Sequence, residues 1–275
     1  MSTTLVPGVA SALSPLVRRV LAPNPNHMTG PGTNTYLVGV DEVAVIDPGP
    51  DDRGHVDAIV GAAGAERIRW ILLTHTHPDH WPAATRLALR TGAPVLAFPT
   101  REPGLRLDGR LRDGDAVVGS EFRLEALHTP GHAPNHLCFR LEEERVLFTG
   151  DNVLDGMWSV ISPERGGDMA EYLHSLERMR RLRTAWLAPG HGERIDDARA
   201  RIDEYLAHRR DRERQVLRAL RREPATVTEL VARLYPDLDA PLVPVAARQV
   251  HAHLLKLRTE GRVTGRSVRA RWAVA

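Results

Sequence analysis

The sequence contains one cysteine, Cys138, and one lysine, Lys256, among its 275 residues. A single cysteine leaves no internal disulfide bond available, so a reducing cytoplasm is the expected location. No apolar run approaches the ~18 residues needed to span a bilayer. Arg18 and Arg19 follow, rather than precede, a weakly apolar N-terminal segment, which is the wrong order for a secretory signal. We therefore expect a soluble cytoplasmic protein with no membrane association.

The near-absence of lysine affects how the charge is interpreted. Residues 1–207 carry 22 arginines and 28 acidic residues, whereas residues 208–275 carry 15 basic and 7 acidic residues. Basic tails often contact nucleic acid. Arginine, however, replaces lysine along the whole chain, beside abundant alanine and proline, which indicates a general composition bias. The charge of the tail is therefore weak evidence for such a partner.

The order of the predicted elements indicates an α/β (α+β) fold. The segment 71–73 is a short buried strand, 81–91 a helix and 94–98 the next strand, which is a strand, helix, strand passage. Antiparallel strands are predicted at 116–118, 122–126, 137–141 and 145–148, a helix at 168–181 and a last strand at 185–188. A chain of this length has room for one large domain and a small one.

The strand at 71–73 leads directly into three histidines and one aspartate within six residues. In an extended backbone His75 and His77 point the same way, while Asp79 and His80 follow the turn at Pro78 and approach from another direction. Imidazole and carboxylate are ligands that zinc accepts, at about 2.0 to 2.2 Å. A solvated, His-rich turn that caps the next helix is the alternative. The motif predicts that one loop supplies ligands to two neighbouring cations.

Further polar residues stand where other predicted strands end. They are His132, Asp151 and His191, and glycine flanks each of them. Taken singly, a histidine in a loop is usually only hydrogen-bonded, and an aspartate after glycine can simply make a turn. Their joint occurrence with the first motif favours a site for two metals.

These residues resemble the signature of the metallo-β-lactamase superfamily, His-x-His-x-Asp-His followed by a single His, a single Asp and a final His. The resemblance implies a four-layer αβ/βα sandwich with two metals at one edge of its sheets. It also implies which residues hold them: His75, His77 and His132 on one zinc, Asp79, His80 and His191 on the other, and Asp151 as the bridge. Iron and manganese are alternatives to zinc.

A closer similarity covers nearly the whole chain. The segment 32–38 (Gly-Thr-Asn-Thr-Tyr-Leu-Val), the Thr-Pro-Gly-His-x-x-x-His of 129–136 and the tail resemble the β-lactamase-like protein 2 subgroup. That subgroup includes an endoribonuclease that acts on single-stranded RNA. Residues 155–167 depart from it, because this segment looks longer here, and the departure bears on the substrate.

The C-terminal part predicts a winged helix from its own pattern. A charged helix over 195–222 ends before Pro224, and Thr226 to Glu229 is a capping box that opens a second helix. A third helix runs over 245–260 and a terminal hairpin follows. We expect a catalytic domain at 1–207 and a winged-helix domain at 208–275. On the third helix, Arg248, His251, His253 and Lys256 either contact nucleic acid or form the solvated face of a packing helix.

Two zinc ions that share a bridging hydroxide imply hydrolysis, since the cations lower the pKa of bound water toward 7. Asp79 is expected both to ligate and to pass a proton. His136 is expected to act in catalysis, either beside the ligands or facing substrate, with a structural role as the alternative. Asn34, Trp81 and Trp158 are expected to contact substrate, and simple packing is the alternative for the two tryptophans.

Several functions stay open at this point. We expect a phosphodiesterase, an endoribonuclease acting on single-stranded RNA by resemblance. The alternative is an acyl or thioester hydrolase resembling glyoxalase II or the polyketide thioesterases. A winged-helix protein that only senses a ligand has no need for seven metal ligands. A mononuclear iron oxygenase is also possible, but Asp79, His80 and His191 would provide ligands for a second metal, which argues against it. Both a monomer and a homodimer are compatible with the sequence.

Overall fold

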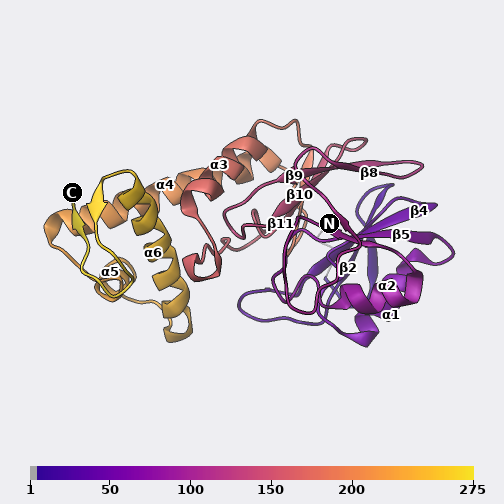
Figure 1. Cartoon of the computed structure of the whole chain (residues 1–275), viewed down its shortest axis with the longest axis horizontal. Coiled ribbons are helices and arrows are strands. Elements are labelled where there is room, and N and C mark those ends of the chain that lie inside the picture. The colour runs from indigo at the N-terminus through magenta and orange to yellow at the C-terminus, as the bar shows by residue number, and fades with distance from the viewer. Residues whose placement is uncertain (1–4) are drawn as a thin grey trace. The chain divides into compact units, whose positions relative to one another are not determined.

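The computed structural model describes residues 5–275, which form two compact units (Figure 1). The first unit comprises residues 5–129, 135–158 and 183–199, and the second comprises 130–134, 159–182 and 200–275. The segment 130–134 is a short loop, and both of its neighbours along the chain, Thr129 and Asn135, belong to the first unit. None of the helices within 5–275 combines the length and apolar character that crossing a membrane requires.

The first unit contains a seven-stranded sheet whose strands lie side by side in chain order. They are β1 (Ala10–Ala12), β2 (Val17–Leu21), β3 (Asn34–Val38), β4 (Glu42–Ile46), β5 (Arg67–Leu72), β6 (Val95–Ala97) and β7 (Gly109–Arg110). Strands β1 to β4 pair antiparallel and β4 to β7 pair parallel. Helices α1 (Arg53–Ala63) and α2 (Ala83–Thr91) make the crossovers from β4 to β5 and from β5 to β6. Their buried Ile59 and Leu87 pack with Val45 and Ile71 of the sheet.

The second sheet of this unit has five strands in the order β12-β11-β10-β9-β8. These are β8 (Ala116–Val118), β9 (Arg123–His128), β10 (Leu137–Leu141), β11 (Val146–Gly150) and β12 (Trp186–Pro189). Strands β11 and β12 are parallel and the other pairs are antiparallel. One apolar core joins side chains of both sheets, with Tyr36 and Ile46 from the first and Phe139 and Phe148 from the second. The first unit is therefore layered as helices, sheet and sheet.

Parallel pairing explains why polar side chains from distant segments meet. Asp47 and His75 follow the parallel neighbours β4 and β5, and Asp151 and His191 follow the parallel neighbours β11 and β12. Ligand sites form outside the carboxyl ends of parallel strands, because the chain leaves all of them at the same edge of the sheet. The fold thus delivers these four residues to two adjacent sheet edges.

The second unit is mainly helical. It contains α3 (Met169–Arg180), most of α4 (Ala198–Arg222), α5 (Val227–Leu234), α6 (Val243–Thr259), the short 3-10 helices Pro163–Arg165 and Ala240–Leu242, and a hairpin of β13 (Val263–Thr264) and β14 (Ala273–Val274). Leu220, Leu230, Leu254 and the fully buried Trp272 form the core of its C-terminal part. Thr226 and Glu229 make the predicted capping box at the start of α5.

Candidate metal centre

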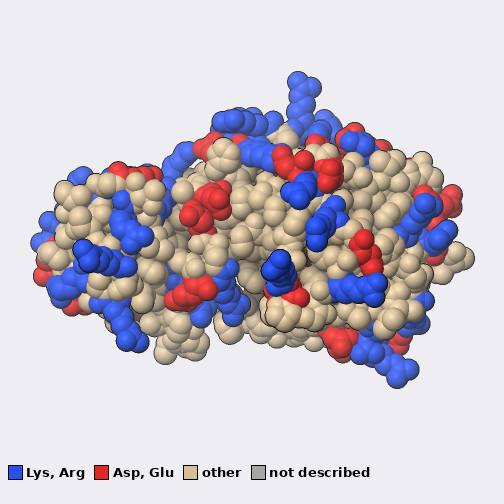
Figure 2. Space-filling view, in the orientation of Figure 1, with Lys and Arg blue, Asp and Glu red and all other residues tan. Residues whose placement is uncertain are grey.

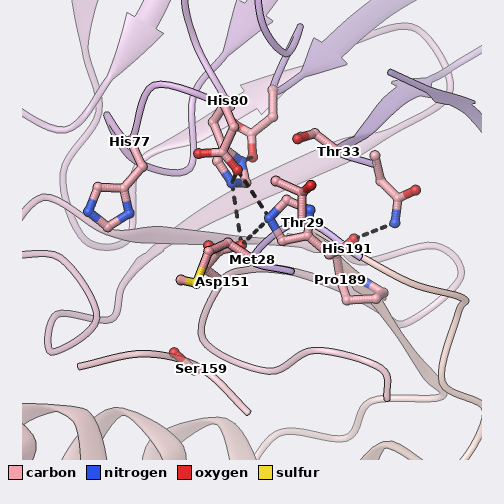
Figure 3. Close-up of polar contacts among 12 residues, drawn as sticks. Met28, Thr29, Thr33, His77, His80, Asp151, Ser159, Pro189 and His191 are labelled. Carbon is pink, nitrogen blue, oxygen red and sulfur yellow. Dashed lines mark hydrogen bonds and ion pairs between the residues drawn. The ribbon is translucent and has the colours of Figure 1, made fainter. Parts of the chain in front are cut away.

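Three of the predicted ligands converge within the first unit. Asp79, His80 and His191 each offer a ligand atom, and these atoms lie within 4.8 Å of one another. Figure 3 shows His80 and His191 beside Asp151. Asp79 Oδ2 lies 3.2 Å from His191 Nε2 and 3.4 Å from His80 Nε2. His80 and His191 are almost completely buried. One carboxylate and two imidazoles therefore face one point, as a bound cation requires.

A second group adjoins the first through Asp151. His75, His77 and Asp151 also offer atoms within 4.8 Å of one another. Asp151 Oδ1 lies 3.3 Å from both His80 Nε2 and His191 Nε2, while its Oδ2 lies 3.9 Å from His75 Nε2. The two oxygens of this carboxylate thus face different groups.

A buried carboxylate fixes the rings of two of these histidines. Asp47 Oδ2 accepts from the Thr74 hydroxyl at 2.6 Å and lies 2.9 Å from His80 Nδ1, and its Oδ1 accepts the Thr74 amide at 2.7 Å. The single hydroxyl hydrogen of Thr74 goes to Asp47, so Thr74 Oγ1 can only accept from His75 Nδ1, 2.9 Å away. Both rings then carry their hydrogen on Nδ1, so that Nε2 is the nitrogen turned toward the other donor groups: His75 Nε2 lies 2.9 Å from His77 Nδ1, and His80 Nε2 faces Asp79 and Asp151.

The loop that carries His191 is held by β3 and the residues beside it. His191 Nδ1 donates to the Gly32 carbonyl at 3.0 Å, which turns Nε2 toward Asp79 and Asp151. Asn34 donates its amide hydrogens to the carbonyls of Pro189 and Gly192, both at 2.9 Å, and the Tyr36 hydroxyl donates to Pro189 at 2.8 Å. Because Asn34 is 1% exposed, these contacts support a positioning role for it. Its predicted contact with substrate stays a prediction.

Two glycines allow the donor groups to come close. Gly150 has a φ of +46°, and a Cβ added there would lie 2.7 Å from His136 Nε2 and 2.8 Å from Thr74 Oγ1. A Cβ on Gly190 would lie 2.6 Å from Asp151 Oδ1. Any larger residue at either position would push the donor groups apart.

His136, the other predicted catalytic residue, is fully buried beneath Asp151. Its Nε2 accepts the backbone N–H of Asp151 at 3.2 Å, and its Nδ1 lies 3.2 Å from the Thr129 hydroxyl. The ring therefore orients the segment that carries Asp151. Of the roles predicted for His136, this contact supports one beside the ligands.

The electrostatics of the centre show that its acidic and basic groups need one another. Burial alone would raise the pKa of the Asp151 carboxyl, but His191 and His80 hold that pKa well below its usual range. Burial alone would lower the pKa of His191, but Asp151 outweighs it and raises the pKa to about 9. The pKa of His80 is raised in the same way by Asp79 and Asp151. Protons on these imidazoles offset the buried negative charge, which is the charge that a divalent cation would compensate.

The donor set fits a divalent metal. Nitrogen and carboxylate oxygen donors in this number suit zinc, iron or manganese. Within the described part of the chain, His80 Nε2 is buried without a hydrogen-bond partner and faces Asp79 and Asp151. An orphaned, oriented nitrogen of this kind is costly unless a ligand satisfies it.

The remaining predicted residues lie as follows. His132 belongs to the second unit, on the loop 130–134. Trp81 is half-buried and packs against the core between the first sheet and its helices, so its contacts support packing. Trp158 is half-buried at the end of a first-unit segment, and its contact with substrate stays a prediction.

Sequence reasoning did not identify Asp47 and Thr74 as site residues. Asp47 lies in Asp-Pro-Gly, which reads as the end of a strand, and Thr74 precedes the metal motif. One signal was present: Asp47, like the predicted ligands, is a carboxylate at a strand end. Its φ of +51°, uncommon for a residue other than glycine, is visible only in the structure.

Comparison with known families gives two matches. The model described as the metallo-beta-lactamase superfamily matches residues 28–191. The model described as the beta-lactamase associated winged helix domain matches residues 226–272. These ranges include all seven predicted ligands and the helices α5 and α6.

Individual proteins agree with the family models. A "Lactamase-like protein adaB" of Aspergillus niger is 40% identical over 77% of this chain, which spans 66% of that protein's length. A "Beta-lactamase-like protein 2 homolog" of Caenorhabditis elegans is 31% identical, and the match covers 90% of this chain and 86% of that protein. An "Atrochrysone carboxyl ACP thioesterase dmxR1" of a Cryptosporiopsis species is 32% identical, and the match covers 91% of this chain and 82% of that protein. Among solved structures, a metallo-beta-lactamase family protein of Thermus thermophilus has a TM-score of 0.81 at 28% identity, covering 96% of this chain and 100% of that one.

Proposed function

Because this chain belongs to the metallo-beta-lactamase superfamily and carries the associated winged helix, we propose that it is a hydrolase with two divalent cations. The observation that carries the proposal is the position of Asp151. One of its oxygens lies 3.3 Å from two histidines of one donor set, and the other faces His75 of the adjoining set. A shared carboxylate of this kind suits two cations that lie close together.

We assign the ligands as the resemblance implies. Asp79, His80 and His191 would hold one zinc ion, and we call them the second set. His75, His77 and His132 would hold the other, as the first set, and Asp151 would bridge the two. His132 lies three residues from Thr129 and three from Asn135, both in the first unit, so its loop starts and ends there.

When bound, the two cations supply Lewis-acid activation of a water molecule and of the attacked group. The residues of the chain do the rest. Asp79 is 26% exposed at its side chain, so it is placed both to ligate and to move a proton. His136 accepts the backbone N–H of Asp151 and so fixes its position. Asp47 orients the ring of His80 directly and the ring of His75 through Thr74.

For the substrate we propose an acyl thioester. A relative whose name describes it as an ACP thioesterase matches 91% of this chain at 32% identity. Two cations of α6 also lie in ion pairs: Arg248 with Glu164 at 3.4 Å, and Lys256 with Glu213 and Glu260, both at 2.6 Å. Figure 2 shows basic and acidic side chains interspersed on the visible face. Cations that are already paired with carboxylates are less available to neutralise a phosphate backbone.

A phosphodiesterase acting on single-stranded RNA is the second candidate. The winged-helix match and the excess of basic residues in 208–275 favour it. RNA binding of that origin weakens steeply with salt, because cations bound to the nucleic acid are released on binding. Thioester hydrolysis depends on salt much less.

The test is a parallel assay of the zinc-loaded full-length protein on acyl-CoA and N-acetylcysteamine thioesters and on single-stranded RNA, at low and high salt. We expect thioester turnover that is lost with a chelator, restored by zinc and absent in His77→Ala. Salt-sensitive RNA cleavage without thioester turnover would establish the second candidate. A protein that binds no metal, or a His77→Ala variant with full activity, would overturn the proposal as a whole.

A further inference from the structure

The loop that carries His132 is anchored within the second unit. The Ser175 hydroxyl donates to the Pro130 carbonyl at 2.7 Å, and the Asp168 amide donates to the Gly131 carbonyl at 2.9 Å. Gly131 has a φ of +125°, and a Cβ there would lie 2.3 Å from the Cα of Tyr172 on α3. The backbone around His132 is therefore fixed against α3.

The ring of His132 is fixed by the segment 159–161. Its Nδ1 lies 2.8 Å from the Val160 carbonyl and 3.2 Å from the Ser159 hydroxyl oxygen. A carbonyl can only accept, so Nδ1 carries the hydrogen and Nε2 keeps its lone pair. This is the tautomer that a metal ligand needs, and it depends on the direction of one backbone carbonyl.

Gln249 of α6 sets that direction. Its Oε1 accepts the N–H of Ile161 at 3.4 Å, and its Nε2 donates to the carbonyl of Ser159 at 2.9 Å. The Ile161 N–H and the Val160 carbonyl belong to the same planar peptide group and point in opposite directions. Holding one end of this group therefore aims the other end at His132.

Arg209 of α4 fixes the orientation of the Gln249 side-chain amide. The Arg209 side chain is 2% exposed, and it donates to Gln249 Oε1 at 3.3 Å and to the carbonyl of Ser159. A guanidinium has donors only, so the amide oxygen of Gln249 must face it and the amide nitrogen must face Ser159. Arg209 also lies over the ring of Tyr172, 5.3 Å from its centroid.

We infer that Gln249, held by Arg209, is a positioning residue for His132, so that the winged helix sets the geometry of one metal ligand. The inference rests on the proposed function, because it takes His132 as a ligand of the first set. It assigns to α6 a role in metal binding, in place of the contact with nucleic acid that its sequence suggested.

Zinc titration of the full-length apo-protein tests the inference. In Gln249→Met the side-chain length is kept and both hydrogen bonds are lost. We expect one zinc to bind as in the wild type and the other to bind roughly ten- to a hundredfold more weakly, the usual effect of losing an outer partner of a ligand. Gln249→Glu keeps an acceptor for Ile161 and should stay closer to the wild type. Gln215→Met is the matched control, because Gln215 lies in the same unit and its side chain bonds Asp211 and Arg212, away from residues 159–161.

A second readout does not need metal. Long-range ¹H–¹⁵N spectra of the apo-protein should show His132 with its hydrogen on Nδ1 in the wild type, and a mixture of tautomers in Gln249→Met. Two zinc ions bound to Gln249→Met with wild-type affinity would overturn the inference while leaving the proposed function intact. A wild type that binds no zinc would instead overturn the proposed function. If Gln249→Met does not fold, Gln249→Asn, whose amide is too short to reach, decides by the same criterion.

Discussion

The two donor sets differ in where their support comes from. Asp79, His80 and His191 lie in one compact unit, and residues of that same unit, Asp47 and Gly32, fix both histidine rings. The first set takes His75 and His77 from this unit but, as we propose, His132 from the other, where α3, α4 and α6 hold its loop and its ring partner. With the ligands as we propose them, one metal would depend on the metallo-β-lactamase part alone, whereas the other would also depend on the winged helix.

The largest effect is expected from Asp151→Ala, because this residue serves both sets. Two cations supply several kcal/mol of stabilisation to the reaction, so activity should fall on the order of a thousandfold. Zinc content, measured by atomic emission after dialysis, should fall for both sites. His191→Ala is the comparison, since it should remove one zinc only. Two tightly bound zinc ions in Asp151→Ala would show that this carboxylate does not join the sets.

A smaller effect is expected from Asp47→Asn. The amide would present hydrogens to His80 Nδ1 and to Thr74, which favours the wrong tautomer of both His80 and His75. We expect both zinc ions to bind roughly ten- to a hundredfold more weakly, in contrast to Gln249→Met, which should affect one. Calorimetric titration of the two variants side by side checks this. An Asp47→Asn variant that loses affinity at one site only would mean that Thr74 does not transmit its effect to His75.

The smallest effect is expected from His253→Met, which should change the pH dependence of stability and leave zinc binding at pH 7.5 unchanged. His253 on α6 is 2% exposed, and burial together with Arg209 and Lys256 lowers its pKa to about 3. Between pH 6.5, the ordinary pKa of histidine, and pH 3, His253 is protonated in the unfolded chain and neutral in the folded one. The contribution of His253 to the free energy of unfolding should therefore fall by about 1.4 kcal/mol for each pH unit as the pH drops over this range.

Urea unfolding at pH 7.5 and pH 5.0 measures this effect. His253→Met should lose less stability than the wild type between the two pH values. The exposed His174 gives the matched control, and His174→Met should behave as the wild type. Equal losses in wild type and His253→Met would mean that another group causes the pH dependence.

Much of the fold follows from local pattern. The helices at 81–91 and 168–181 and the capping box at Thr226 are where the sequence predicts them. A turn at Leu13 to Leu16 separates β1 from β2. Gly109–Arg110 forms a strand because β6 supplies its hydrogen-bond partners. Such short pairings depend on a neighbour that local sequence does not reveal.

The site divides in the same way. His75, His77, Asp79 and His80 form one contiguous motif, and Asp151 and His191 stand at strand ends beside glycine, so the residue pattern indicates them. Asp47 does not stand out, because Asp-Pro-Gly is also an ordinary turn. Gln249 stands out even less, since its partners are 88 and 90 residues away along the chain. Contacts that orient a ligand are tertiary, and single-sequence periodicity carries no trace of them.

The position of α6 late in the chain has a consequence for biosynthesis. Residues 1–199 leave the ribosome before Gln249 has been made, so during translation His75 and His77 lack a preset third imidazole. A nascent or prematurely terminated polypeptide would thus carry the second set without a complete first one. With the ligands as we propose them, the first set would reach its full affinity for zinc only after α6 has packed against residues 159–161.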